Sequence, residues 1–124
     1  MSARLALSLA ALLLFVAVGL GAFGAHALKS RLPADLLAVW HTGVQYHLWH
    51  ALGMIAVGLC SAIVPDGPWL RSAGALLLAV IILFSGSLYA LALGAPRELG
   101  VLTPFGGIAL MLGWLALVVA LLRA

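Results

Sequence analysis

The sequence predicts an all-α fold, an integral membrane four-helix transmembrane bundle, and two observations support this. Of the 124 residues, 66% are hydrophobic and only 7% are charged, with a mean hydropathy of +1.28. A soluble domain of this size cannot bury so much apolar surface. The chain also contains four apolar stretches that reach the roughly 20 residues a helix needs to cross a hydrocarbon core. Inside lipid, a segment must satisfy its own backbone hydrogen bonds, so we expect helices.

The four expected helices lie at approximately residues 5–27, 34–64, 69–93 and 104–123. Together they leave no room for a soluble domain, so we expect a single transmembrane domain over residues 1–124. The first helix imitates a secretory signal, because Arg4 precedes an apolar run that ends in a small-residue triplet around His26. Its apolar run is longer than the core of an ordinary signal peptide. We therefore expect it to remain as the first membrane helix.

The second expected helix would be about 47 Å long at 1.5 Å per residue, which exceeds the thickness of the membrane core. Its first third should therefore tilt, kink or lie in the interfacial zone. Pro33 and Asp35 favour a helix start here, since proline suits the first turn and an acidic side chain complements the helix dipole. Three aromatic residues of the types that settle at headgroup depth follow, namely Trp40, Tyr46 and Trp49.

The stretch "WHTGVQYHLWH", residues 40–50, holds three of the four histidines of the chain. At about 100° per residue, helical geometry places His47 and His50 on one face together with Trp40. His41 and Gln45 lie on the far side, with Trp49 nearer to them. One face should point into the bundle, and the other should meet headgroups, water or a partner.

Four spans place both termini and the loop around residues 65–68 on one side, which we call the terminal end, and the other two loops at the opposite end. Polar and small residues of all four helices concentrate toward the opposite end. The terminal half contains runs such as "LALSLAALLLFVAV" and "GWLALVVALL", and we expect generic lipid-embedded packing there. The concentrated residues are Gly21, Gly24, His26, Lys29, Ser85, Gly86, Ser87, Tyr89, Arg97, Glu98, Thr103, Gly106 and Gly107.

The small residues in this set predict close helix packing. Thr103 before Pro104 predicts a helix N-cap with proline in the first turn. Cys60 is the only cysteine, and we expect a small buried hydrophobe there.

Basic residues near helix ends are equally frequent on both sides, so the positive-inside rule does not discriminate between the two membrane orientations. The free amino terminus, and pairing of Asp35 and Glu98 with the basic residues near them, favour cytoplasmic termini.

Three chemical alternatives compete with a simple binding role. Metal or haem binding could use His47 and His50 at i, i+3 with His26 from the neighbouring helix, although no carboxylate lies inside an expected span. Covalent catalysis could use Ser85 or Ser87, but no nucleophile signature is present. A transporter or channel would need polar groups through the full membrane thickness, and only Ser8, Cys60 and Ser61 interrupt the terminal half.

The remaining interpretation is a non-enzymatic binding or accessory module with a polar pocket or docking surface in one leaflet. It would hold a lipid headgroup, a quinone-like apolar ligand or a partner subunit, and a homo-oligomer is an alternative partner. Arg31 and Arg97 could bind phosphate, although ion pairs with Asp35 and Glu98 are the simpler expectation. The sequence specifies no cofactor, and six scattered basic residues do not form a nucleic-acid surface. The candidate ligand-binding residues are His26, Gln45, Tyr46, His47, His50, Ser85, Ser87, Tyr89, Arg97 and Thr103.

Four ordered motifs, "GAFGAHALKS", "TGVQYHLWHALG", "LFSGSLYAL" and "RELGVLTPFGG", carry a resemblance to a known family. The chain resembles the domain of unknown function 423 family of small multi-pass membrane proteins, which includes transmembrane protein 256-like members. The resemblance covers nearly the whole chain. It implies a multi-pass protein of a bacterial inner membrane without an assigned biochemical activity, and it supplies no catalytic residues.

Overall fold

The computed structural model describes residues 1–124 and contains only helices and short connections. Ser2 caps the first helix, because its Oγ accepts a hydrogen bond from the Leu5 backbone N–H at 3.2 Å. Gly94 follows the last turn of α4 with φ +103°, a left-handed conformation that glycine adopts without strain. The elements are α1 Ala3–Ala25, η1 Leu28–Ser30, α2 Ala34–Cys60, α3 Pro68–Val80, η2 Ile81–Ser85, α4 Gly86–Ala92, η3 Arg97–Val101 and α5 Leu102–Leu122.

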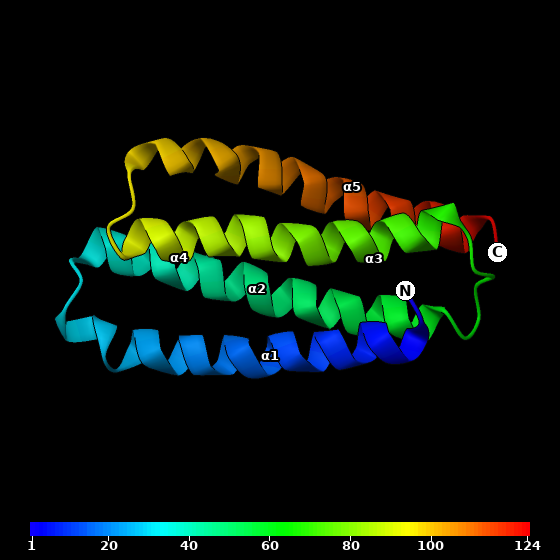
Figure 1. The fold of residues 1–124 in the computed structure, drawn as a ribbon, viewed down its shortest axis with the longest axis horizontal. Helices are drawn as coiled ribbons and strands as arrows, with labels where there is room; N and C mark the ends of the chain where they lie inside the picture. Colours follow the sequence, from blue (N-terminus) through cyan, green and yellow to red (C-terminus); the bar gives the residue numbers. More distant parts are fainter.

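Four helical rods lie side by side, with α3, η2 and α4 forming one continuous rod (Figure 1). The N-terminus, the C-terminus and the α2–α3 loop lie at one end, and the other two connections lie at the opposite end (Figure 1). This is the arrangement that the sequence predicted. The rods do not form a closed ring, because α1 packs mainly on α2 and α5 packs mainly on α3. The α2 and α3–α4 rods are therefore the central pair.

Three of the rods are long and apolar enough to cross a membrane, namely Ala3–Ser30, Pro68–Ala92 and Arg97–Leu122. Helix α2 is not among them, although it runs between α1 and the α3–α4 rod over a similar length (Figure 1). The histidines, the glutamine and the tryptophans between residues 40 and 50 lower its hydropathy. An all-helical fold with three membrane-capable rods is thus established.

The helix boundaries differ from the expected ones at three places. Helix α2 ends at Cys60, and residues 61–64 form turns instead of continuing the helix. A π-helical turn, η2, interrupts the third rod at Ile81–Ser85, and periodicity alone gave no sign of it. The N-cap predicted at Thr103 is wrong, because η3 runs directly into α5 and leaves Thr103 inside the helix.

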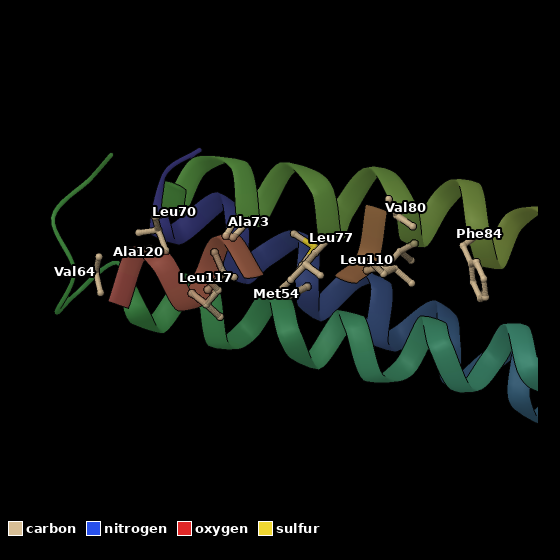
Figure 2. Packing of buried hydrophobic residues seen from close by; sticks show 14 of the residues in the cluster. Met54, Val64, Leu70, Ala73, Leu77, Val80, Phe84, Leu110, Leu117 and Ala120 are labelled. Carbon is tan, nitrogen blue, oxygen red and sulfur yellow. The ribbon is translucent and has the colours of Figure 1, made fainter. Parts of the chain in front are cut away.

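Apolar side chains from all four rods form the main core. Met54 of α2 and Leu77 of α3 are its largest completely buried hydrophobic side chains, and Leu110 of α5 packs beside them (Figure 2). Ala10 of α1 belongs to the same core. A smaller cluster of Leu28, Trp40 and Ala92 lies toward the opposite end. Small residues on α1 let this helix approach α2 closely.

The outer faces of α1 and α5 are strongly apolar. Phe15 of α1 is 77% exposed, and Met111 of α5 is 72% exposed. A water-soluble surface rarely carries so many large exposed hydrophobic side chains, whereas a lipid-facing surface requires them. The outer faces therefore fit a bilayer environment.

Gly24 provides a first test of the packing, because a Cβ at this position would lie 2.5 Å from Cδ1 of the buried Trp40 ring. We predict that Gly24→Ala destabilises the protein by about 1–3 kcal/mol, since the ring must move away from α1. Gly19→Ala is the matched control, because a Cβ there meets nothing within 4 Å. Thermal unfolding in one detergent, followed by circular dichroism, measures both. Equal stability of the two variants would contradict the proposed close contact.

Candidate functional site

The polar run of α2 divides between a buried and an exposed face, as helical geometry predicted. Trp40, His47 and His50 are buried, whereas His41 and Gln45 are exposed. The indole Nε1 of Trp40 donates a hydrogen bond to the Leu20 backbone carbonyl of α1 at 3.0 Å. Trp40 is therefore an interior residue that links two helices.

His47 and Tyr89 form the central contact of the site. The Nδ1 atom of His47 lies 2.9 Å from the Tyr89 hydroxyl oxygen of α4. The Tyr89 ring also packs against Trp40, with ring centroids 4.7 Å apart. His47 is only 4% exposed, so the pair lies inside the protein. Two of the predicted site residues, one from each central rod, are thus in direct contact.

The second ring nitrogen of His47 has no hydrogen-bond partner. Nε2 is buried, and no polar atom of the protein meets the geometric criteria for a bond to it. The backbone of Leu13 in α1 faces the ring, but without a hydrogen bond of acceptable geometry. An unsatisfied buried polar atom is rare in native proteins, because desolvation costs about 1–3 kcal/mol. Nε2 is therefore left with at most a weak contact to the Leu13 backbone, and a better-placed acceptor could bind it.

The Nδ1 atom of His50 has its hydrogen-bond partner within the same helix. Its Nδ1 lies 2.6 Å from the Tyr46 backbone oxygen, so Nδ1 carries the proton and donates. The His50 ring stacks on the Tyr46 ring at 11° between planes, with centroids 5.7 Å apart. Trp114 of α5 approaches the other side at a centroid distance of 6.0 Å. The His50 ring is therefore packed between aromatic side chains of α2 and α5.

Ser85, at the end of the π-helical turn, joins the central rods. Its Oγ donates a hydrogen bond to the Gly43 backbone carbonyl at 2.8 Å, and the residue is almost completely buried. Gly43 is required at this crossing, because a Cβ there would lie 2.9 Å from Cε1 of Tyr89. Gly43 was not among the predicted site residues. The signal available in the sequence was this glycine, between Thr42 and Val44, on the same helical face as His47.

Ser87 and Thr103 connect α4 with α5. The Ser87 hydroxyl donates to the Phe84 backbone carbonyl at 2.7 Å, and its oxygen lies 3.2 Å from Oγ1 of Thr103. Gly106 allows this approach, since a Cβ there would lie 2.9 Å from Cβ of Phe84. Thr103 thus bonds across the helix interface instead of capping its own helix. We refer to Gly43, His47, His50, Ser85, Ser87, Tyr89 and Thr103 as the polar cluster.

Four predicted site residues do not join the polar cluster. The ring of Tyr46 is half-buried and packs against His50 and Phe84 without a hydrogen bond from its hydroxyl. His26, Gln45 and Arg97 are exposed, and their side chains make no hydrogen bond within the protein. His26 lies at the C-terminal end of α1, away from His47 and His50. No group of three or more His, Cys, Asp or Glu side chains is arranged to hold a metal ion. The three-histidine metal or haem site suggested by the sequence is therefore not assembled.

The ion pairs expected at the opposite end are also not formed. Neither Asp35 nor Glu98 pairs with Arg31 or Arg97, and the only salt bridge is at the terminal end, between Arg71 and Asp66. The side chains at the opposite end lie on separate short connections and remain exposed. Exposed ion pairs contribute little to stability, so nothing enforces them here.

The polar cluster lies in the half of the bundle toward the opposite end. Its members extend from Thr103, near the start of α5, to His50, just past the middle of α2. A cavity of about 280 Å³ lies elsewhere, at the terminal end between α1, α2 and α3. Apolar packing was expected in this half, and Leu70, Ala73 and Leu117 belong to the apolar core there, but the cavity was not predicted. Its lining includes Asp66 and Arg71.

Asp66 and Arg71 form a two-pronged pair beside this cavity. Arg71 Nε donates to Oδ1 of Asp66 at 3.0 Å, and Nη2 donates to Oδ2 at 2.6 Å. The guanidinium holds the pKa of the Asp66 carboxyl below its ordinary value, so the carboxylate stays charged at neutral pH. Because both side chains are solvent-exposed, the pair contributes little to stability.

Ser85 allows a test of the polar cluster. We predict that Ser85→Ala lowers the unfolding free energy by about 0.6–2 kcal/mol, because the hydrogen bond to the Gly43 carbonyl is lost. Ser72→Ala in α3 is the matched control, since Ser72 is exposed. Unfolding in mixed detergent micelles measures both variants. A loss of the same size in Ser72→Ala would show that the effect does not come from the interhelical bond.

Comparison with known proteins places this geometry in a family. The model of the protein of unknown function DUF423 matches residues 20–107. The UPF0382 membrane protein YwdK of Bacillus subtilis is 47% identical over 108 residues, which cover 87% of this chain and 88% of that protein. A UPF0382 membrane protein of Haemophilus influenzae is 40% identical over 111 residues, covering 90% and 88% of the two chains. No solved structure matches. The chain therefore belongs to the DUF423 family, an uncharacterised family of membrane proteins.

Proposed function

We propose that this protein is a non-enzymatic binding or accessory module of the bacterial inner membrane. All four rods cross the bilayer as a single transmembrane domain, with both termini in the cytoplasm. Within it, His47 presents a buried hydrogen-bond donor to an acceptor oxygen on an apolar ligand or partner. The observation that supports this proposal most directly is the unpartnered Nε2 atom of His47.

The proposal requires α2 to cross the membrane despite its polar run. Its 27 residues correspond to about 40 Å at 1.5 Å per residue, which exceeds a hydrocarbon core of about 30 Å. The buried polar side chains of α2 bond to neighbouring helices or to its own backbone, which removes most of their cost in lipid. A polar helix between apolar ones is the expected arrangement for a membrane protein with an internal site.

The direction of the His47–Tyr89 hydrogen bond determines whether Nε2 is a donor or an acceptor. The Tyr89 hydroxyl has no other partner, so it donates to Nδ1 and satisfies both groups. In a neutral imidazole, an accepting Nδ1 leaves the proton on Nε2. His47 then presents an N–H toward α1, where the Leu13 backbone lies. A carbonyl, quinone or ester oxygen would satisfy it.

The packing of α1 suggests how an apolar molecule reaches this donor. Helix α1 contacts mainly α2, and its other faces are exposed. A small displacement of α1 would therefore open the α1–α2 interface to the bilayer without disturbing the central rods. A quinone-like ring with a lipid tail fits this route, because its carbonyl oxygen accepts and its ring is apolar.

A short-chain quinone tests the site, since quinones quench tryptophan fluorescence and Trp40 lies beside Tyr89. We predict saturable quenching of the purified protein in detergent, and a loss of affinity of about tenfold in His47→Leu because the donor is removed. His41→Leu, which changes an exposed histidine of the same helix, should bind like the unmodified protein. Identical quenching curves for all three proteins would refute the role of His47.

Cysteine accessibility tests the four-span topology. In a Cys60→Ala background, we predict that a membrane-impermeant maleimide labels Ser30→Cys only from outside intact cells. Ala62→Cys should be labelled only from the cytoplasmic side, because α2 separates the two positions. Both residues are exposed at the ends of α2. Labelling of both cysteines from one side would mean that α2 does not span the membrane.

A further inference from the structure

The terminal cavity combines an apolar wall with a polar rim. Its volume is about 280 Å³, and Ala6, Val57 and Leu70 supply apolar surface from three different helices. Gly74 keeps part of the space open, since a Cβ there would lie 3.3 Å from Cε of Met1 and 3.5 Å from Cγ1 of Val57. A pocket just below the roughly 300–1,000 Å³ range for small-molecule sites holds a small ligand or one part of a larger one.

The rim carries a positive and a negative group side by side. Arg71 and Asp66 both line the cavity, with side chains 63% and 67% exposed. Their mutual contact uses two of the five guanidinium N–H donors and leaves acceptor positions on the carboxylate. Both groups can therefore bind a further partner without separating. The hydroxyls of Ser2 and Ser61 lie on the same rim.

Two helices begin at this rim. Helix α1 starts after Ser2, and α3 starts at Pro68 with no side-chain cap. The positive end of each helix dipole thus lies beside the cavity and adds to the field of Arg71. These groups together favour a phosphate on the Arg71 side, whereas Asp66 favours a cation on its own side.

The depth of the cavity indicates an amphiphile. Gly74 lies about 9 Å along α3 from Pro68, at 1.5 Å per residue. The cavity therefore extends from headgroup level into the first part of the apolar layer. A fully polar ligand would leave the wall formed by Ala6, Val57 and Leu70 in contact with charged groups, so the occupant needs an apolar end.

We infer that the terminal cavity binds a phospholipid whose headgroup carries a primary ammonium next to its phosphate. The phosphate contacts Arg71 and the helix starts, the ammonium contacts Asp66, and the first carbons of one acyl chain lie against Ala6 and Val57. A purely anionic headgroup places no positive group opposite Asp66. A quaternary ammonium has no N–H to donate to this carboxylate. The inference is independent of the His47 site, which lies in the middle of α2.

Native mass spectrometry of the full chain in mild detergent tests this inference. The probes are phosphatidylethanolamine, phosphatidylglycerol and phosphatidylcholine with identical acyl chains, added at equal concentration. We expect one phosphatidylethanolamine per chain to be retained at least about tenfold better than either other lipid, the factor that corresponds to one hydrogen bond between charged groups.

Substitutions separate the contributions of individual cavity residues to lipid retention. Arg71→Gln should weaken retention of phosphatidylethanolamine about tenfold, and Asp66→Asn should abolish its advantage over phosphatidylglycerol. Gly74→Leu should block retention by filling the cavity. Arg4→Gln is the matched control, because it removes an arginine from the same end of the protein without altering the cavity lining, and it should retain the lipid normally.

Two outcomes would overturn the inference. The first is equal retention of the three lipids, or stronger retention of phosphatidylglycerol, by the unmodified protein. The second is an equal effect of Arg71→Gln and Arg4→Gln, which would mean that only the overall charge of this end matters. If Gly74→Leu fails to fold, the comparison between Arg71→Gln and Arg4→Gln still decides the question.

Discussion

The structure depends on one constraint, that polar side chains inside an apolar protein must find partners without water. The answer here is a series of bonds between successive rods. Trp40 ties α2 to the Leu20 carbonyl of α1, Ser85 ties η2 to the Gly43 carbonyl of α2, and Ser87 of α4 meets Thr103 of α5. Each bond needs two backbones to approach closely, which explains the glycines at the same crossings. Within this series, Nε2 of His47 is the buried side-chain atom left without a partner.

The two halves of the protein are held together by different kinds of contact. The half toward the opposite end is held by hydrogen bonds and aromatic contacts and has little free space. The terminal half is held by apolar contacts and leaves a cavity between the helix ends. Ala10, Met54 and Leu77 are completely buried between the two regions, so the cavity and the polar cluster are separate. A continuous path across the protein would require these side chains to move.

Features with a strong periodic signal could be predicted from the sequence. Hydropathy gave the helices and the common end of both termini, and the 3.6-residue period gave the buried face with His47 and His50. Features that depend on relations between distant residues could not be predicted. The partner of His47 depends on the register between α2 and α4, and the cavity depends on the position of Gly74 opposite α1. The cap at Thr103 was predicted wrongly because local pattern gave no information about the contact with Ser87.

The π-helical turn at Ile81–Ser85 has a consequence for how this chain tolerates insertions and deletions. Such a turn holds one more residue than the α-helical path it replaces, and each residue rotates the following side chains by about 100°. Deleting one residue within this turn, ahead of Ser85, would restore a regular α-helix and leave Ser87 and Tyr89 facing their partners. Deleting one residue elsewhere in the rod would rotate these side chains away from them, so the turn is the position in this rod where a one-residue deletion does least harm to the polar cluster.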